Sequence, residues 1–277
     1  MRFRHPPPPR LLGVIAALLV LASAAFAVAQ FRGFPRGVDG TLAPAQFPDG
    51  DFVICRLVYP EVRRYGQGWR TDYPLGERNL SIRFSELTRT RVSQGRDGSP
   101  NHYLVRLTDD QLFSCPFLLA GDIASAGFSE ADAARLREYL LKGGFLWTDD
   151  HWGSEEWEVW TRELAKVLPP DEYPIEEITP ADPIFRTLFV VPEMLQIPNI
   201  GYWRRSGGDT SEQGADSAVP HFYVVRDHHG RIMLAMTHNT DIADAFEREA
   251  DDPEFFSRFS PRGYALGINV LLYALTH

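Results

Sequence analysis

Several features that would assign a reaction directly are missing from this sequence of 277 residues. Cysteine occurs only twice, so there is no CxxC pair for a redox dithiol or a zinc ribbon. A glycine-rich phosphate loop, a dinucleotide-binding fingerprint and a G-x-S-x-G nucleophile turn are also missing. Lysine and arginine (28) are outnumbered by aspartate and glutamate (37), and no basic cluster interrupts this acidic excess. Because such a surface repels a phosphate backbone, we expect no nucleic-acid binding.

The first 29 residues have the pattern of an export signal. Three arginines within the first ten residues precede an uncharged run over residues 11–29, which ends in small residues at alternate positions. Signal peptidase would cut this run after Ala27 or Ala29, so we expect an exported protein, periplasmic or extracellular. The alternative is an uncleaved anchor, since about 18 apolar residues can span a bilayer.

Beyond the signal, residues 30–50 are predicted to be a flexible lead-in, and residues 51–277 a folded domain. After signal cleavage no membrane span is expected. Cys55 and Cys115 lie in the exported part, where an oxidising compartment would permit a disulfide. Each lies in a strand-like apolar run, however, where a free buried cysteine behaves as a small hydrophobic residue. We therefore expect free thiols, with the disulfide as the alternative.

Predicted strands alternate with predicted helices along the domain. By β-branched content and length, strands are expected over residues 52–59, 103–107, 117–120, 145–148, 221–226 and 231–237. By apolar spacing and caps, helices are expected over residues 79–90, from Ser129 to Gly143-Gly144, from Ser154 to Pro169, and over residues 262–276. Residues 201–219 are polar and are predicted to form a mobile loop. This alternation predicts an α/β fold with a mostly parallel sheet covered on both faces, and a late antiparallel hairpin.

Polar side chains directly follow two of the predicted strands. Ligands bind at the carboxyl ends of the strands in an open α/β sheet, so these positions are candidates for a site. Each cluster alone is more typical of a polar turn, a helix cap or a structural histidine. Convergence of the two clusters in one sheet would favour a ligand site. The first cluster is Asp149, Asp150 and His151, and the second is His238, Asn239 and Asp241.

A long loop over residues 60–78 contributes further candidates. Asp72, Tyr73 and Glu77 could fold over the strand ends and supply an aromatic face for a ring-shaped ligand. The alternative is a local aromatic plug over the core. The pair His228-His229 lies in the predicted hairpin turn, and we expect it at the surface.

A set of short segments, specific only in combination, carries a resemblance to a known family. The segments are Arg56-Leu57-Val58-Tyr59, Asp72-Tyr73-Pro74, Glu77, Asn79-Leu80, Leu112-Phe113, Pro116-Phe117, Gly143-Gly144-Phe145-Leu146, Asp149-Asp150, Trp152-Gly153, Asp182-Pro183-Ile184-Phe185, His238-Asn239, Asp241 and Tyr273-Ala274-Leu275-Thr276-His277. Together they resemble the bacterial domain of unknown function 4159 family over nearly all of residues 51–277.

The resemblance implies an exported protein with a flavodoxin-like, class I glutamine amidotransferase-like three-layer sandwich, similar to the trehalose-utilisation type. The family has no assigned reaction. Its members often occur beside a MoxR-type ATPase and von Willebrand-type membrane proteins, which implies a role in the cell envelope by association. True amidotransferases carry a nucleophilic cysteine in the turn that matches the one after Thr148. Neither Cys55 nor Cys115 falls there, so cysteine-dependent glutamine hydrolysis is not expected. The trehalose-utilisation type also places a histidine where His238 stands.

Two functions from different classes follow from these residues. The first, which we favour, is a non-catalytic envelope module that binds a small polar ligand or a partner protein through Asp149, Asp150 and His238. The second is a metal-assisted hydrolase acting on a saccharide-like or amide substrate. There the same three residues would hold a divalent cation, and His151 or Asp241 would act as general base. No cofactor is certain from the sequence, although a divalent metal is compatible with these ligand types.

Overall fold

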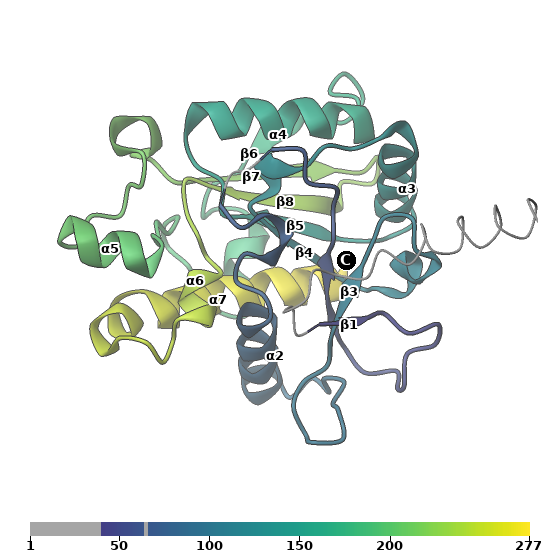
Figure 1. The fold of residues 1–277 in the computed structure, drawn as a ribbon, viewed down its shortest axis with the longest axis horizontal. Helices are drawn as coiled ribbons and strands as arrows, with labels where there is room; N and C mark the ends of the chain where they lie inside the picture. Colours follow the sequence, from purple (N-terminus) through teal and green to yellow (C-terminus); the bar gives the residue numbers. More distant parts are fainter. Residues whose placement is uncertain (1–39, 64–65) are drawn as a thin grey trace, which may run out of the picture. The chain divides into compact units, whose positions relative to one another are not determined.

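An eight-stranded sheet organises the part of the chain that the structure describes, residues 40–63 and 66–277 of this computed structural model (Figure 1). The predicted signal segment, residues 1–29, lies outside that part. The strand order is β1-β3-β2-β4-β5-β8-β7-β6. The strands are β1 (Thr41–Leu42), β2 (Ile54–Leu57), β3 (His102–Val105), β4 (Leu118–Gly121), β5 (Leu146–Asp149), β6 (Ile175–Glu177), β7 (His221–Arg226) and β8 (Ile232–His238).

The sheet is parallel from β1 to β8 and antiparallel at its other edge. The five pairings from β1-β3 to β5-β8 are parallel, whereas β8-β7 and β7-β6 are antiparallel. Asp227 accepts the hydrogen bond that closes the turn between β7 and β8, and His228 and His229 are exposed there. The predicted mostly parallel α/β sheet with a late antiparallel pair is therefore confirmed.

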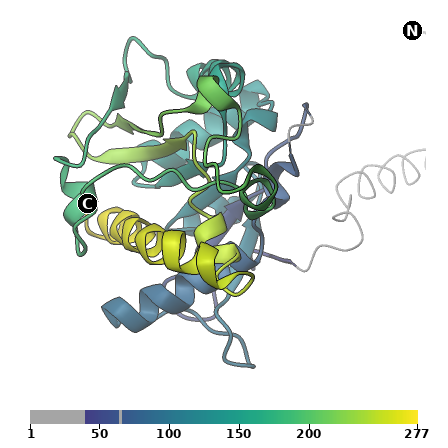
Figure 2. The same cartoon turned by 90° about the vertical axis from the view of Figure 1, so that its left-hand side faces the viewer.

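Helices cover both faces of this sheet. Helices α3 (Glu130–Leu141) and α4 (Gly153–Val167) pack together on one face. On the other face lie α2 (Leu75–Thr88), α6 (Asp244–Glu247) and the long α7 (Pro253–Thr276), which contact one another. Figure 2 shows α2 and α7 together on that side of the strands. A hydrophobic core cluster lies between the sheet and this second layer and includes Phe84, Trp147 and Leu266.

The predicted helix at Ser129 is confirmed with its cap. Ser129 accepts a hydrogen bond from the backbone N–H of Asp132, whose carboxylate accepts one from Ser129 in return. Two other helices begin earlier than the pattern predicts. α7 begins at Pro253 because Asp252 accepts from the backbone N–H groups of Glu254 and Phe255. α2 begins directly after Pro74, four residues ahead of the predicted start.

The structure corrects two local predictions. Ser154 does not cap α4, which begins at Gly153; Ser154 instead donates to Asp216 from both its backbone N–H and its hydroxyl. Residues 201–219 are not a continuous loop, because they overlap α5 (Ile200–Ser206) and a short 3-10 helix at Gly214–Ser217. Asn199 caps α5 through its side-chain oxygen, a signal that lies just ahead of the predicted loop.

The expectation of two free thiols is wrong. Cys55 and Cys115 form a disulfide with an S–S distance of 2.06 Å. Cys55 lies in β2 and Cys115 lies just before β4, and these two strands are neighbours in the sheet. Their Cα atoms are consequently 5.9 Å apart, within the range that a disulfide spans.

The folded unit begins at Gly40. Residues 40–50, predicted as the end of a flexible lead-in, therefore belong to this unit, and Thr41 pairs with Tyr103 of β3. In the described part of the chain, no helix has both the length and the apolar character needed to cross a membrane.

Candidate functional site

The two polar clusters predicted at the strand ends converge. Strands β5 and β8 are parallel neighbours, so residues 149–151 and 238–241 emerge at the same edge of the sheet. His151 and Thr240 form a bridge between the two segments, and the backbone N–H of Asn239 donates to the carbonyl of His151 at 2.9 Å. The direction of strand addition reverses nearby, between β2 and β4. Such reversal points are where open α/β sheets bind ligands.

Asp149 and Asn239 hold this edge together from within. The carboxylate of Asp149, which is 1% exposed, accepts from the hydroxyl of Thr237 and from the backbone N–H of Ala243. Burial raises the pKa of Asp149 to about 7. The side-chain oxygen of Asn239 accepts from the backbone N–H of Gly153 at 2.8 Å. The side chains of Asp149 and Asn239 are therefore engaged in hydrogen bonds that hold the two segments in place.

The predicted histidines lie in a stack of aromatic rings. The ring centroids of His151 and His238 are 5.1 Å apart, and that of His238 lies 4.9 Å from Trp157. His238 Nε2 donates to the carbonyl of Gly153 at 3.0 Å. Burial lowers the pKa of His238 to about 4 and lowers that of His151 well below its ordinary value, so both rings are neutral at pH 7. Neither histidine belongs to a group of three described side chains whose ligand atoms lie close enough to share a metal ion.

Of the three candidate residues in the segment 60–78, only Asp72 lies at the strand ends; Tyr73 and Glu77 do not. Asp72 joins the strand-end carboxylates described below. The hydroxyl of Tyr73 shares a hydrogen bond with His102 Nδ1 at 2.9 Å. Glu77 forms a fully buried ion pair with Arg56 of β2, with 2.5 Å between Oε1 and Nε. Tyr73 therefore packs away from the site, and the aromatic side chain that lines the site is Trp152.

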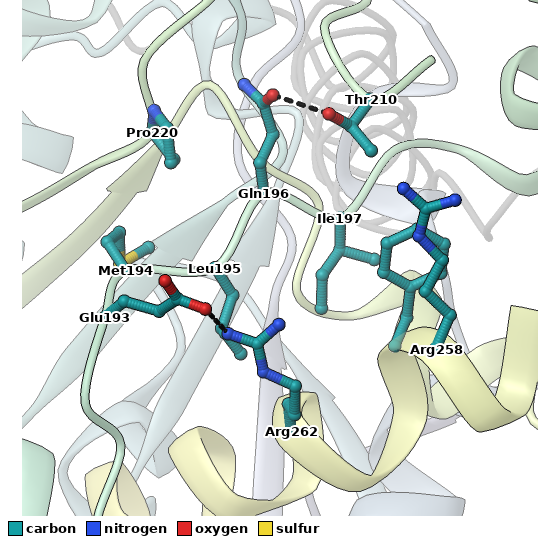
Figure 3. Close-up of a pocket in the computed structure, with 10 residues that line it drawn as sticks. Glu193, Met194, Leu195, Gln196, Ile197, Thr210, Pro220, Arg258 and Arg262 are labelled. Carbon is teal, nitrogen blue, oxygen red and sulfur yellow. Dashed lines mark hydrogen bonds and ion pairs between the residues drawn. The ribbon is translucent and has the colours of Figure 1, made fainter. Parts of the chain in front are cut away.

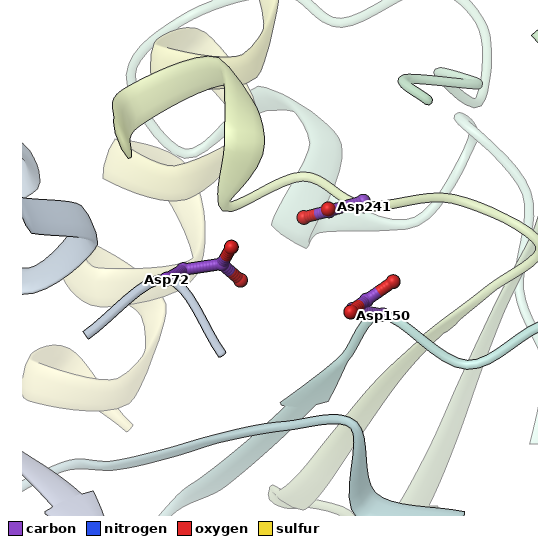
Figure 4. Close-up of side chains that lie close together, drawn as sticks. All are labelled: Asp72, Asp150 and Asp241. Carbon is purple, nitrogen blue, oxygen red and sulfur yellow. The ribbon is translucent and has the colours of Figure 1, made fainter. Parts of the chain in front are cut away.

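Asp72, Asp150 and Asp241 lie together and form the acidic triad (Figure 4). One carboxylate oxygen from each lies within 4.8 Å of the other two. Asp72 and Asp150 have positive φ values of 63° and 56°, a backbone conformation that non-glycine residues seldom adopt. Burial, reinforced by neighbouring carboxylates, raises the pKa of Asp150 to about 6 and raises those of Asp72 and Asp241 well above their ordinary value. The structure thus groups Asp150 with Asp72 and Asp241, rather than with Asp149 and His238.

A second acidic group shares Asp72 and adds Asp244 and Glu247. In this second group a positively charged side chain already contacts the carboxylates: Arg248 Nε lies 2.8 Å from Glu247 Oε2 and 3.5 Å from Asp244 Oδ1. None of the triad carboxylates forms an ion pair with any residue that the structure describes. The triad is therefore the acidic group that has no arginine partner in the described part of the chain.

The triad borders a pocket of about 350 Å³ at the carboxyl edge of the sheet. Each carboxylate in its wall accepts a hydrogen bond that fixes its direction; Gly68 N–H, for example, donates to Asp122 at 2.7 Å. Burial raises the pKa of Asp122 to about 8 and those of two glutamates to about 7. No described residue that lines the pocket is basic. The carboxylates in the wall are Asp122, Asp150, Glu156, Glu212 and Asp241.

Three of these carboxylates were missed in the sequence. Asp122 directly follows β4, so the rule that selects strand ends could have found it. Glu156 lies in the first turn of α4, where an acidic residue is common for helix stability alone. Glu212 lies in the segment predicted as a loop, and no sequence signal marks it.

A separate pocket of about 220 Å³ lies beside α7 and contains none of the predicted site residues (Figure 3). Its polar side chains are largely paired with one another: Arg262 with Glu193, and Thr210 with Gln196 at 2.8 Å. This pairing leaves few groups for a ligand, and the five-carboxylate pocket is the stronger candidate.

Comparison with known proteins agrees with the resemblance in the sequence. A search of curated proteins finds no significant match. A family model described as Domain of unknown function (DUF4159) matches residues 54–275, a span that includes the triad and every carboxylate of the pocket. This chain therefore belongs to the DUF4159 family.

Proposed function

We propose that this protein is an exported, non-catalytic binding module of the cell envelope, whose acidic pocket takes a small polar ligand of positive charge. The observation that carries the proposal is the pocket at the carboxyl edge, with five carboxylates and no basic residue among its described lining. Oriented carboxylates favour an ammonium or guanidinium group and repel phosphate or carboxylate ligands. The volume of about 350 Å³ suits a small molecule.

Export is supported by two independent features. The N-terminal residues have the basic, apolar and small-residue order of a cleavable signal. The disulfide between Cys55 and Cys115 is buried, and structural disulfides persist mainly in oxidising compartments outside the cytosol.

We also propose the flavodoxin-like, class I glutamine amidotransferase-like class for this fold. The parallel strands β3-β2-β4-β5-β8, counted along the chain from β2, follow the order 2-1-3-4-5, which is the flavodoxin-like order. In the turn after β5, where the resembled enzymes carry their cysteine, this chain has Asp150. This substitution supports binding over cysteine-based catalysis.

Titration of the metal-free, signal-cleaved protein with spermidine, a trication, tests the proposal. Isothermal titration calorimetry should show saturable binding of spermidine and none of citrate, a trianion of similar size. Glu212→Gln should weaken spermidine binding at least threefold, because it removes one charge from the pocket. Glu193→Gln is the matched control outside the pocket and should leave the affinity unchanged. Equal binding of both probes, or equal affinity of Glu212→Gln and wild type, would overturn the proposal.

A second candidate, a metal-assisted hydrolase, is supported by Glu156 and Glu212. Both side chains line the pocket, and burial raises the pKa of each to about 7, the range in which a carboxyl group serves as general acid or base near neutral pH. Such an enzyme should hydrolyse a member of a saccharide or amide substrate panel when Mn²⁺ is present. The activity should fall at least 100-fold in Glu156→Gln. Hydrolysis that survives this substitution would remove the candidate.

A further inference from the structure

We propose that Asp72, Asp150 and Asp241 form a binding site for a hard divalent cation of the Ca²⁺ or Mg²⁺ class. This inference goes beyond the proposed function, because a pocket for an organic cation requires no metal ion. The three carboxylates come from three separate segments, before α2, after β5 and after β8, and meet at one point (Figure 4). Metal sites are commonly assembled in this way, from ligands that only the folded chain brings together.

A buried oxygen without a partner gives independent support. Asp72 is only 6% exposed, and its Oδ2 has no hydrogen-bond partner among the described residues. In Figure 4 the carboxylate of Asp72 is directed toward those of Asp150 and Asp241. A buried carboxylate oxygen costs free energy unless a donor or a cation meets it. A cation held between the three side chains would satisfy this oxygen.

The nearby arginines do not take the place of this cation. The Nε of Arg56 is engaged by Glu77, and Arg56 forms no ion pair with a triad carboxylate in the described part of the chain. Arg248 pairs with Asp244, Glu247 and Asp251 and so compensates the second acidic group. Neither arginine forms an ion pair with a triad carboxylate, so a divalent ion would be the counter-charge of the triad once its carboxyl groups release their protons to bind it.

The ligand set selects the class of metal. It consists of carboxylate oxygens alone, which Ca²⁺ and Mg²⁺ prefer, whereas Zn²⁺ favours imidazole and thiolate ligands. The two nearby histidines are stacked on each other, and both cysteines are bonded in the disulfide. With Ca²⁺–O distances of about 2.4 Å, two ligand oxygens can be up to about 4.8 Å apart, which the triad satisfies. Asp150 and Asp241 also line the pocket, which gives the ion a path from solvent.

Calorimetric titration of the chelator-treated, signal-cleaved protein with CaCl₂, MgCl₂ and ZnCl₂ in separate runs tests the site. We expect one Ca²⁺ or Mg²⁺ per chain, bound at least tenfold more tightly than Zn²⁺. Asp72→Asn and Asp150→Asn should each weaken binding at least tenfold. Asp132→Asn is the matched control, because it makes the same chemical change at a buried carboxylate that caps α3, away from the site.

Folding of the variants is checked by thermal unfolding without metal. Asp72→Asn should unfold at the same temperature as wild type or higher, because Asp72 forms no ion pair with a described residue that the substitution would break and its Oδ2 has no hydrogen-bond partner there, so weaker metal binding cannot be assigned to misfolding. Absence of metal binding by wild type, or undiminished binding by Asp72→Asn, would overturn the inference. Spermidine binding without metal binding would leave the proposed function standing while this site fails. Metal binding without spermidine binding would support the cation site, and the proposed function would fail.

Discussion

At the scale of single residues, Arg56 and Glu77 form a buried ion pair, in which the carboxylate of Glu77 compensates the positive charge of Arg56. Both side chains are 0% exposed, and the two terminal nitrogens of Arg56 have no hydrogen-bond partner among the described residues. Gly121, at the end of β4, leaves room for this guanidinium, because a Cβ there would come within 3.1 Å of Arg56 Nη1. The positive charge of Arg56 therefore depends on one carboxylate contact for its compensation.

Glu77→Gln should lower the free energy of unfolding by about 3 kcal/mol, because removal of one partner leaves a buried charge uncompensated. Urea unfolding followed by circular dichroism measures this loss. Glu86→Gln makes the same chemical change in an exposed ion pair with Arg83, and should change stability by less than about 0.5 kcal/mol. Equal losses in the two variants would contradict the role assigned to Arg56 and Glu77.

The site residues show how far sequence patterns can be followed. The strand-end rule selected the edge of the sheet where the acidic pocket lies and named Asp150 and Asp241 of its lining, because the rule depends only on where strands end. The rule could not tell which of Asp149 and Asp150 faces the pocket. Neighbouring side chains near a strand end point in different directions, and the rule does not specify which of them points toward the ligand. Asp149 turns toward Thr237 and Ala243, and Asp150 toward the pocket.

At the scale of elements, sequence patterns predicted six of the eight strands and most of the helices that the structure describes, but they missed the short edge strands β1 and β6 and placed some boundaries wrongly. The N-caps of α2 and α4 are Pro74 and Trp152, and neither makes a side-chain cap hydrogen bond, so no cap signal exists in the sequence. The disulfide was missed for a related reason. Its geometry depends on β2 and β4 being neighbours, and pairing between strands far apart in sequence is not encoded in local periodicity.

One prediction concerns the junction of β8, α4 and the segment before β7. Asn239 has a φ of 60°, accepts from Gly153 N–H and donates to the carbonyl of Val219 at 2.8 Å. Asn239→Ala should cost about 2–4 kcal/mol, from two buried hydrogen bonds and a left-handed backbone that alanine disfavours.

Asn239→Gly separates the two contributions, because glycine adopts a positive φ without strain. Urea unfolding should show Asn239→Gly to be about 1 kcal/mol more stable than Asn239→Ala, and less stable than wild type. If the two variants were equally stable, backbone strain would not contribute at Asn239. If Asn239→Gly matched wild type, the two hydrogen bonds would not hold the junction together.

At the scale of the whole molecule, the concentration of carboxyl groups at one edge makes stability depend on pH. The pKa is raised to about 8 for Asp122 and to about 7 for Asp149, Glu156 and Glu212, chiefly by burial. Above pH 6.5 the same groups in the unfolded chain are already ionised, so the folded chain binds more protons there. Stability must then fall as pH rises. Below pH 6.5 the lowered pKa of His238 acts in the opposite direction, so the effect of the carboxyl groups is separable only above that pH.

Without metal ions, the free energy of unfolding should therefore decrease from pH 6.5 to pH 8.5. Each carboxyl group with a pKa near 7 should contribute at most about 1 kcal/mol to this decrease, because solvent screens the carboxyl groups that are partly exposed. Urea unfolding across this range measures the slope. Glu212→Gln should make the slope shallower, whereas Glu193→Gln, outside the pocket, should leave it unchanged. If the triad binds Ca²⁺, excess Ca²⁺ should stabilise the protein more at pH 8.5 than at pH 6.5, because protons compete with the ion for the same carboxylates. A stability that rises with pH in metal-free buffer would mean that these carboxyl groups are ionised without penalty, and would remove the electrostatic basis of both the pocket and the cation site.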